Sequence, residues 1–189
     1  ARRVDSFLAG SENAKNRIKK IYGMNSKIIY PFVDLERFSG VESYDGGYLV
    51  AVGRPNRYKK LDLVKRASVK LNIPLKIITG GLTDEMVVQV LAGCRALGIA
   101  GIEDFGLVSL EAQALGKPVV AFKEGGSLET VIPGKTGIFF DDQKRVLLVK
   151  HSYRDSTHWS LPGGYAKGKE HPKEALEREV KEETGFEVS

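Results

Sequence analysis

The sequence of 189 residues lacks the features that mark secreted, cysteine-rich or membrane-spanning chains. Its one cysteine, Cys94, excludes a disulfide framework and a zinc site built from cysteines within the chain. No apolar run is long enough to cross a bilayer, and no apolar signal region follows the first residues. Internal repeats and low-complexity segments are also missing. We therefore expect a cytoplasmic protein with no transmembrane segment.

The remaining composition is that of a globular chain. Apolar residues make up 42% and charged residues 28%, which excludes a disordered tail or a fibre. The net charge of +5 is unevenly distributed: residues 1–140 hold 20 Lys/Arg and 14 Asp/Glu (+6), and residues 141–189 hold 9 and 10 (−1). The basic excess forms no arginine-rich run and no patch interleaved with aromatics. We therefore expect phosphate handling and no nucleic-acid partner.

Apolar strands and amphipathic helices alternate over the first 140 residues. Strands are expected at residues 27–30, 48–52, 75–79, 96–100, 118–122 and 137–140. The helices between them begin at Ser11, near Leu61, at Thr83, near Gly106 and at Ser127. Continuously apolar strands alternating with helices predict an α/β fold: a Rossmann-like parallel sheet with helices on both faces. Such sheets bind ligands beyond the carboxyl ends of their strands.

The pattern changes after residue 140. A strand is expected at 145–150, a polar hairpin loop at 151–158, and a charged helix from Pro172 to about Thr184. We therefore predict two units, residues 1–140 and 141–189.

The first candidate site combines two glutamates with two cations. Glu103 and Glu111 are separated by seven residues, and a helix begins between them at Gly106, where backbone N–H groups attract anions. Carboxylates in such a place can hold sugar hydroxyls, and Arg54 and Lys59 can neutralise a diphosphate leaving group. Taken alone, a glutamate pair at this spacing is weak evidence of a site, because two solvated helix glutamates are the more common case.

The surrounding motifs make this region resemble a known enzyme family. In chain order they are Gly53-Arg54 to Lys59, Gly101-Ile102-Glu103-Asp104-Phe105-Gly106, Glu111-Ala112, Gly116-Lys117-Pro118, Gly125-Gly126-Ser127-Leu128-Glu129 and Gly134-Lys135-Thr136-Gly137. The sequence closely resembles the donor-binding C-terminal half of family-4 retaining glycosyltransferases of the GT-B fold.

The resemblance implies a nucleotide-sugar donor and transfer without a metal or other cofactor. It implies that Arg54 and Lys59 stabilise the diphosphate, that Glu103 faces the donor sugar, and that Glu111 binds the ribose. Gly106, Gly125 and Gly126 are the further donor-binding candidates.

Two departures from the resemblance matter for function. The acceptor-holding N-terminal domain of the family has no counterpart here, so we expect transfer to need a missing acceptor domain or a partner chain. After Gly81 a further helix and short strand are also missing, and we expect one central element of the sheet to be absent.

The second candidate site is a helix rich in carboxylates. Glu179, Glu182 and Glu183 stand at positions i, i+3 and i+4, on one face of the expected helix. Like charges so placed repel unless a cation lies between them, and oxygen ligands suit Mg²⁺ or Mn²⁺. A solvated polar face is the alternative for any glutamate-rich helix.

The same segment resembles the complete Nudix box: Gly164, Glu170, and Arg178 to Gly185. The resemblance implies Mg²⁺-dependent hydrolysis of a nucleoside diphosphate derivative. Glu179, Glu182 and Glu183 would hold the metal, the last two as catalytic residues, while Arg178 would orient a carboxylate and Glu170 would support the loop. The later elements of a Nudix fold have no counterpart in the sequence.

Three functions therefore remain open. The chain is a nucleotide-sugar-binding glycosyltransferase unit, a Nudix pyrophosphohydrolase, or an inert chimeric or designed α/β protein. Other candidates favour structural roles: His151, His158 and His171 suit surface positions, Cys94 suits a buried apolar position, and Trp159 suits anchoring of a loop.

Overall fold

The computed structural model describes residues 4–141, 149–153, 156–160 and 178. The chain divides into two compact units, Ala1–Gln143 and Lys144–Ser189.

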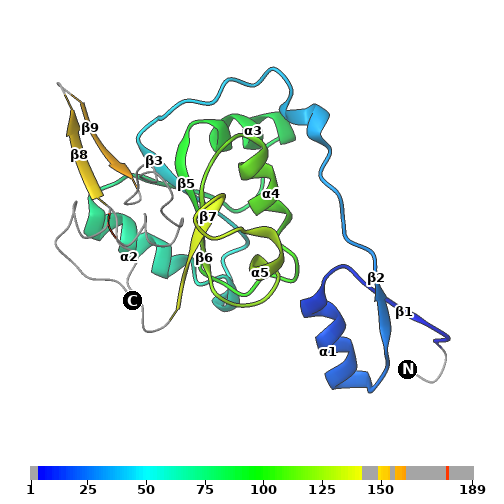
Figure 1. Ribbon diagram of the computed structural model, residues 1–189. Coiled ribbons are helices and arrows are strands. Elements are labelled where there is room, and N and C mark those ends of the chain that lie inside the picture. Colours follow the sequence, from blue (N-terminus) through cyan, green and yellow to red (C-terminus); the bar gives the residue numbers. More distant parts are fainter. Residues whose placement is uncertain (1–3, 142–148, 154–155, 161–177, 179–189) are drawn as a thin grey trace. The chain divides into compact units, whose positions relative to one another are not determined.

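A five-stranded, all-parallel sheet forms the centre of the first unit (Figure 1). Its strands are β3 (Tyr48–Val52), β4 (Leu75–Ile78), β5 (Cys94–Ile99), β6 (Val119–Phe122) and β7 (Gly137–Phe140), in the order β4-β3-β5-β6-β7. The connecting helices are α2 (Leu61–Leu71), α3 (Asp84–Ala92), α4 (Leu107–Ala114) and the single turn α5 (Ser127–Thr130). The predicted α/β fold with a parallel sheet and flanking helices is confirmed.

The two faces of the sheet are covered unequally. Helices α3, α4 and α5 lie on one side, over a core that contains the fully buried Val50, Leu97 and Val119 (Figure 1). Helix α2 lies on the other side, where Val64 packs with Ala51 and Ala100. Because both faces of the sheet are covered, its strands are largely apolar along their length and do not alternate between apolar and polar residues.

The chain reverses direction across the sheet at β3. It runs from β3 to the edge strand β4, then returns through α3 to β5, which pairs with β3 on its other side. The connections after β3 and β5 therefore lead away from one another, and in open parallel sheets this is the place where ligands bind, beyond the carboxyl ends of the two strands. The loops that carry Arg54, Lys59 and Glu103 begin at this point.

Local capping explains the helix boundaries that the sequence predicted. Ser11 Oγ accepts a hydrogen bond from the Ala14 N–H at 2.9 Å at the start of α1 (Glu12–Tyr22), and Gly23 ends that helix with φ of 68°. Thr83 Oγ1 accepts from the Met86 N–H at 3.3 Å at the start of α3.

Residues 7–28 form a β1–α1–β2 segment within the first unit, and the sequence pattern predicted only part of it. Strand β1 (Phe7–Ala9), which was not predicted, pairs in parallel with β2 (Ser26–Ile28) across α1. A strand of three residues is too short for an alternating pattern to identify it. The chain then passes through the 3-10 helix η1 (Leu35–Phe38), whose Phe38 is buried in the core.

Strand β4 is followed directly by α3, so no additional helix and strand lie between Gly81 and α3. Because β3 pairs directly with both β4 and β5, the sheet is continuous at its centre and β4 is its edge. Strand β5 begins two residues earlier than predicted, and Cys94 is therefore inside a strand and buried, as expected for an apolar position.

In the second unit, two strands are described. Strands β8 (Val149–Tyr153) and β9 (Ser156–Ser160) form an antiparallel hairpin. The expectation of a polar loop over residues 151–158 was wrong, because His151 and His158 are a cross-strand pair inside the hairpin. Cross-strand backbone hydrogen bonds outweigh the polar composition here.

The core of the sheet should tolerate truncation poorly. Leu97 in β5 is fully buried, so Leu97→Ala should lower the free energy of unfolding by about 3 kcal/mol through lost burial and a residual cavity. Val69 in α2 is 73% exposed, and Val69→Ala should change it by less than about 0.5 kcal/mol. Urea unfolding of both variants provides the measurement, and equal losses would contradict the assigned strand.

Candidate functional site

Lys59 and Glu103 form an ion pair beyond the carboxyl ends of β3 and β5. Lys59 Nζ donates to both carboxylate oxygens of Glu103 at 2.7 Å. The two side chains are only 19% and 14% exposed, so solvent screens this pair less than it screens a surface pair. Two of the three ammonium hydrogens serve Glu103, which leaves one donor for a further oxygen.

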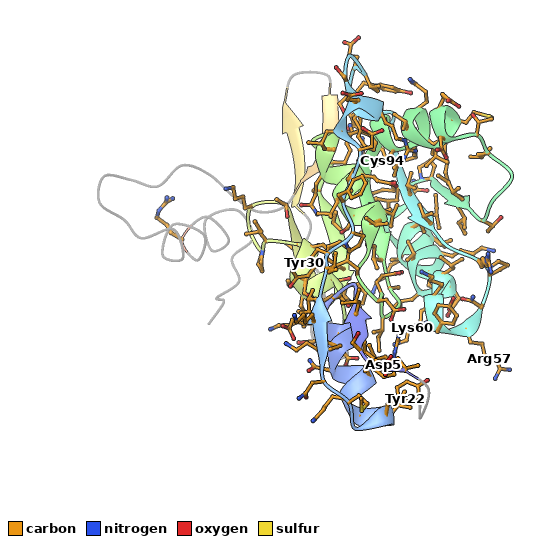
Figure 2. All side chains as sticks on the ribbon, turned by 90° about the vertical axis from the view of Figure 1, so that its right-hand side faces the viewer. Asp5, Tyr22, Tyr30, Arg57, Lys60 and Cys94 are labelled. Carbon is orange, nitrogen blue, oxygen red and sulfur yellow. The ribbon has the colours of Figure 1, made fainter. Side chains whose placement is uncertain are left out.

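Close backbone contacts place Lys59 at this position. It ends the 3-10 helix η2 (Arg57–Lys59), which follows β3. A Cβ at Gly101 would lie 2.3 Å from the Tyr58 carbonyl oxygen, so only glycine lets η2 approach the end of β5 so closely. Arg57 points away from the rest of the chain, whereas Lys60 turns back, with Nζ 4.5 Å from the ring centroid of Phe122 (Figure 2).

The backbone at Glu103 is fixed from two directions. Its carbonyl oxygen accepts from the Gly126 N–H at 2.7 Å and from Asn13 Nδ2 at 3.2 Å. Glu103 and Gly125 also form an isolated parallel bridge. A Cβ at Gly126 would lie 2.3 Å from the Phe105 Cα. Gly125 and Gly126 thus hold the loop that carries Glu103 against the loop after β6.

Gly106 permits the turn that starts α4. It has φ of 92°, in the left-handed region that side chains other than glycine avoid. Ser109 Oγ lies 2.8 Å from both the Gly106 carbonyl oxygen and Thr130 Oγ1, and Gln113 Nε2 donates to the Thr130 carbonyl at 2.9 Å. The bonds from Ser109 and Gln113 to Thr130 join α4 to α5.

Arg54 is separate from this cluster. Its side chain is exposed, and within the described part of the chain it makes no hydrogen bond and no ion pair. The structure therefore brings Lys59 and Glu103 together but does not join Arg54 to them.

Glu111 is a half-buried carboxylate beside a cation. Its side chain is 22% exposed, and Arg37 Nη1 lies 3.6 Å from its Oε1. Burial raises the pKa of Glu111 above its ordinary value, Arg37 opposes that rise, and Asp84 adds to it. The Glu111 carboxylate accepts no hydrogen bond from any described residue, so its oxygens keep their capacity to accept from a ligand.

Several residues at the site were missed by sequence reasoning. The Glu129 carboxylate accepts from the Glu12 and Asn13 N–H groups at 2.7 and 3.1 Å and so caps α1. Arg17 pairs with Asp104 at 2.6 Å, although both side chains are more than half exposed. The only sequence signal for the Glu129 contacts was the position of Glu129 within the glycine motif. Its partners lie more than 100 residues earlier, so no local pattern could identify them.

The Nudix candidates fall almost entirely outside the described residues. The residues outside the described part are Glu170, Glu179, Glu182 and Glu183. Arg178 is described, and it is helical and half-buried. Among the described residues, no three His, Cys, Asp or Glu side chains cluster as metal ligands would.

No helix in the described part of the chain has both the length and the hydropathy of a membrane span.

Two family models match the sequence. "Glycosyl transferases group 1" matches residues 48–151, and "NUDIX domain" matches residues 133–189. The matches overlap at residues 133–151. Strand β7 lies in this overlap and pairs with β6, so its place is in the parallel sheet of the first unit.

Curated relatives are glycosyltransferases. D-inositol 3-phosphate glycosyltransferase 2 of Catenulispora acidiphila is 27% identical over 188 aligned positions, covering 71% of this chain and 44% of that protein. A GDP-mannose-dependent alpha-(1-6)-phosphatidylinositol monomannoside mannosyltransferase of Mycolicibacterium smegmatis is 51% identical over 49 residues, covering 25% of this chain and 13% of that protein. The chain thus spans less than half the length of these relatives.

Solved structures agree on the fold. Anabaena HepE, in complex with UDP and glucose, matches with a TM-score of 0.56 at 20% identity, over 74% of this chain and 50% of that one. Sucrose-phosphate synthase from Thermosynechococcus elongatus matches with a TM-score of 0.62 at 18% identity, over 75% and 46%.

Substitutions of Lys59 and Glu103 should have non-additive effects on the free energy of unfolding, because each charge depends on the other. Lys59→Met or Glu103→Gln alone should each cost about 2 kcal/mol of unfolding free energy, because a partly buried charge loses its partner. The double variant should recover at least about 1 kcal/mol of the summed loss.

The exposed pair Lys15–Glu12 is the matched control for this cycle. Its double-mutant cycle should give a coupling below about 0.5 kcal/mol. Denaturant unfolding measures both cycles, and additive effects at Lys59 and Glu103 would contradict the ion pair.

Proposed function

Because the chain belongs to the glycosyl transferases group 1 family, we propose that residues 1–140 bind a nucleotide-sugar donor and form the donor half of a retaining glycosyltransferase. The observation that carries the proposal is the ion pair between Lys59 and Glu103, beyond the ends of β3 and β5, where the strand order reverses. A ligand-binding role suits this position, since open parallel sheets bind ligands at the point of reversal.

The chemistry of the pair suits a sugar joined to a diphosphate. The Glu103 carboxylate offers acceptors to hydroxyls of the donor sugar. Lys59, adjacent to it, has one remaining N–H donor for an oxygen of the diphosphate, where negative charge grows as the glycosidic bond breaks. Arg54, exposed and without a described partner, supplies a second cation when the donor binds.

Glu111 suits the ribose of the donor. Its carboxylate has electrostatic support from Arg37 but accepts no hydrogen bond within the described part of the chain. A half-buried carboxylate is stabilised when hydroxyl groups donate hydrogen bonds to it. The two vicinal hydroxyls of a ribose would supply such donors.

Names of the similar proteins indicate nucleoside diphosphates. One curated relative is described as GDP-mannose-dependent, and HepE was solved with UDP-glucose. These names do not agree on one base, so both uracil and guanine donors belong in the test.

The acceptor is proposed to lie on another domain or partner chain. Apolar side chains near the N-terminus of the first unit are exposed, among them Leu8 (61%), Ile29 (62%) and Phe32 (88%). A covering partner would remove this apolar surface from water. The chain also spans less than half of the curated relatives named above.

Donor binding is tested directly by calorimetry with UDP- and GDP-sugars. Binding of at least one of them is expected, and Glu111→Ala should weaken it at least about tenfold, because a charge-assisted hydrogen bond is lost. Glu42→Ala, which removes an exposed carboxylate, is the matched control and should leave affinity unchanged. The absence of binding, or an affinity that Glu111→Ala does not alter, would refute the donor site.

A second function is supported by the NUDIX match over residues 133–189. We propose that residues 141–189 carry a Mg²⁺-dependent pyrophosphohydrolase site, in which Glu179, Glu182 and Glu183 hold the metal and Arg178 orients a carboxylate. Bound Mg²⁺ supplies charge neutralisation at diphosphate oxygens and activation of water. An oxygen-only ligand set fits that ion.

Hydrolysis is tested by release of phosphate or nucleoside monophosphate from ADP-ribose, nucleotide sugars and nucleoside triphosphates with Mg²⁺. Glu182→Gln combined with Glu183→Gln should abolish it, since the metal loses two ligands. Glu187→Gln lies beyond the box and should retain it. Activity that survives the double substitution excludes the box as its source, and a chain with neither binding nor hydrolysis would be the inert chimera.

A further inference from the structure

Arg37 lies between carboxylates from two different helices. Its Nη2 is 3.3 Å from Asp84 Oδ2, at the first residue of α3, and its Nη1 is 3.6 Å from Glu111 Oε1 in α4. Each terminal nitrogen therefore faces a different carboxylate. The guanidinium joins η1, α3 and α4 at one point of the first unit.

Local structure places Arg37 there. Asp34 Oδ1 accepts from the Glu36 N–H at 3.1 Å and caps η1. The next residue after Arg37, Phe38, is buried in the core, and the Arg37 guanidinium carbon lies 5.7 Å from its ring centroid. A buried anchor and a capped turn thus fix the backbone from which the side chain extends.

The two ion pairs differ in their exposure to water. The Asp84 side chain is 77% exposed, so solvent screens its attraction to Arg37. Glu111 is 22% exposed and Arg37 is 32% exposed, so their attraction is screened less. Of the two carboxylates, Glu111 therefore depends more on the cation.

We propose that Arg37 is a positioning residue for nucleotide recognition, holding the Glu111 carboxylate in place for the ribose hydroxyls of the donor. This inference rests on the proposed donor-binding function. The separation of 3.6 Å is too long for a hydrogen bond, so the cation attracts the carboxylate without using its acceptor capacity. Arg37 acts through Glu111 and needs no contact with the nucleotide.

Ribose selectivity follows from this arrangement. A ribonucleotide presents two hydroxyls to Glu111, and a 2′-deoxynucleotide presents one fewer. Loss of Arg37 should therefore weaken ribonucleotide binding more than deoxynucleotide binding. A residue that only supported the fold would affect both ligands alike.

The first experiment measures affinities of UDP and dUDP, and of GDP and dGDP, for the full chain by calorimetry. Arg37→Ala should weaken binding of the ribonucleotide about fivefold and of its deoxy analogue less than about twofold. Arg37→Lys keeps the charge and should restore most of the ribose preference. Circular dichroism and unfolding of each variant show that the fold is retained.

The second experiment measures the pH dependence of the same binding. Glu111 accepts hydrogen bonds from both hydroxyls only when ionised, so affinity falls as pH drops through its raised pKa. The charged groups that face it are Arg37 from η1 and Asp84 from α3. Arg37→Ala should move the midpoint of this fall to higher pH, and Asp84→Asn should move it to lower pH. Glu111→Gln reports the contribution of the nucleotide phosphates, which is subtracted.

The outcomes distinguish a failure of the Arg37 role from a failure of the donor site. Loss of ribose preference in both Arg37→Ala and Glu111→Ala, with opposite pH shifts for Arg37→Ala and Asp84→Asn, establishes the positioning role. If Glu111→Ala removes the preference but Arg37→Ala weakens both ligands equally or leaves the midpoint unchanged, the positioning role is refuted and the donor site stands. If no nucleotide binds, or Glu111→Ala has no effect, the donor site fails and the role of Arg37 fails with it.

Discussion

The direct pairing of β3 with β5 is the constraint on which the rest of the first unit depends. Because the chain visits β4 before it returns to β5, the loops after β3 and β5 separate at one point of the sheet. Lys59 comes from one of these loops and Glu103 from the other, and their ion pair spans the place of separation. Two glycines serve this contact: Gly101, after β5, admits η2, and Gly126, in the loop after β6, packs against Phe105.

The same constraint leaves the centre of the sheet continuous although β4 is followed directly by α3. Strand β4 is at the edge and pairs with β3 alone. The central strands β3, β5 and β6 keep their partners, and their side chains Val50, Leu97 and Val119 remain fully buried. The site depends on β3 and β5, and so it can form in a sheet of five strands.

Electrostatics gives the two glutamates of the first site different characters. Glu103 accepts two hydrogen bonds from a lysine, whereas Glu111 has an arginine at longer range and accepts no hydrogen bond from a described residue. Identical carboxyl groups can thus serve different parts of one ligand, since each environment sets its own balance of burial and nearby charge.

The sequence alone determined the order of helices and strands, the parallel sheet and the family resemblance. These follow from short-range physics: apolar runs, helix caps such as Ser11 and Thr83, and motif spacing. It could not identify the short strand β1 or the tight hairpin of β8 and β9, where backbone pairing outweighs composition. Tertiary structure alone decided which cation meets which carboxylate. Lys59 and Glu103 are 44 residues apart, and Arg37 reaches Glu111 from a different element, because only the return of the chain past β3 and the packing of η1 against α3 bring these charges together.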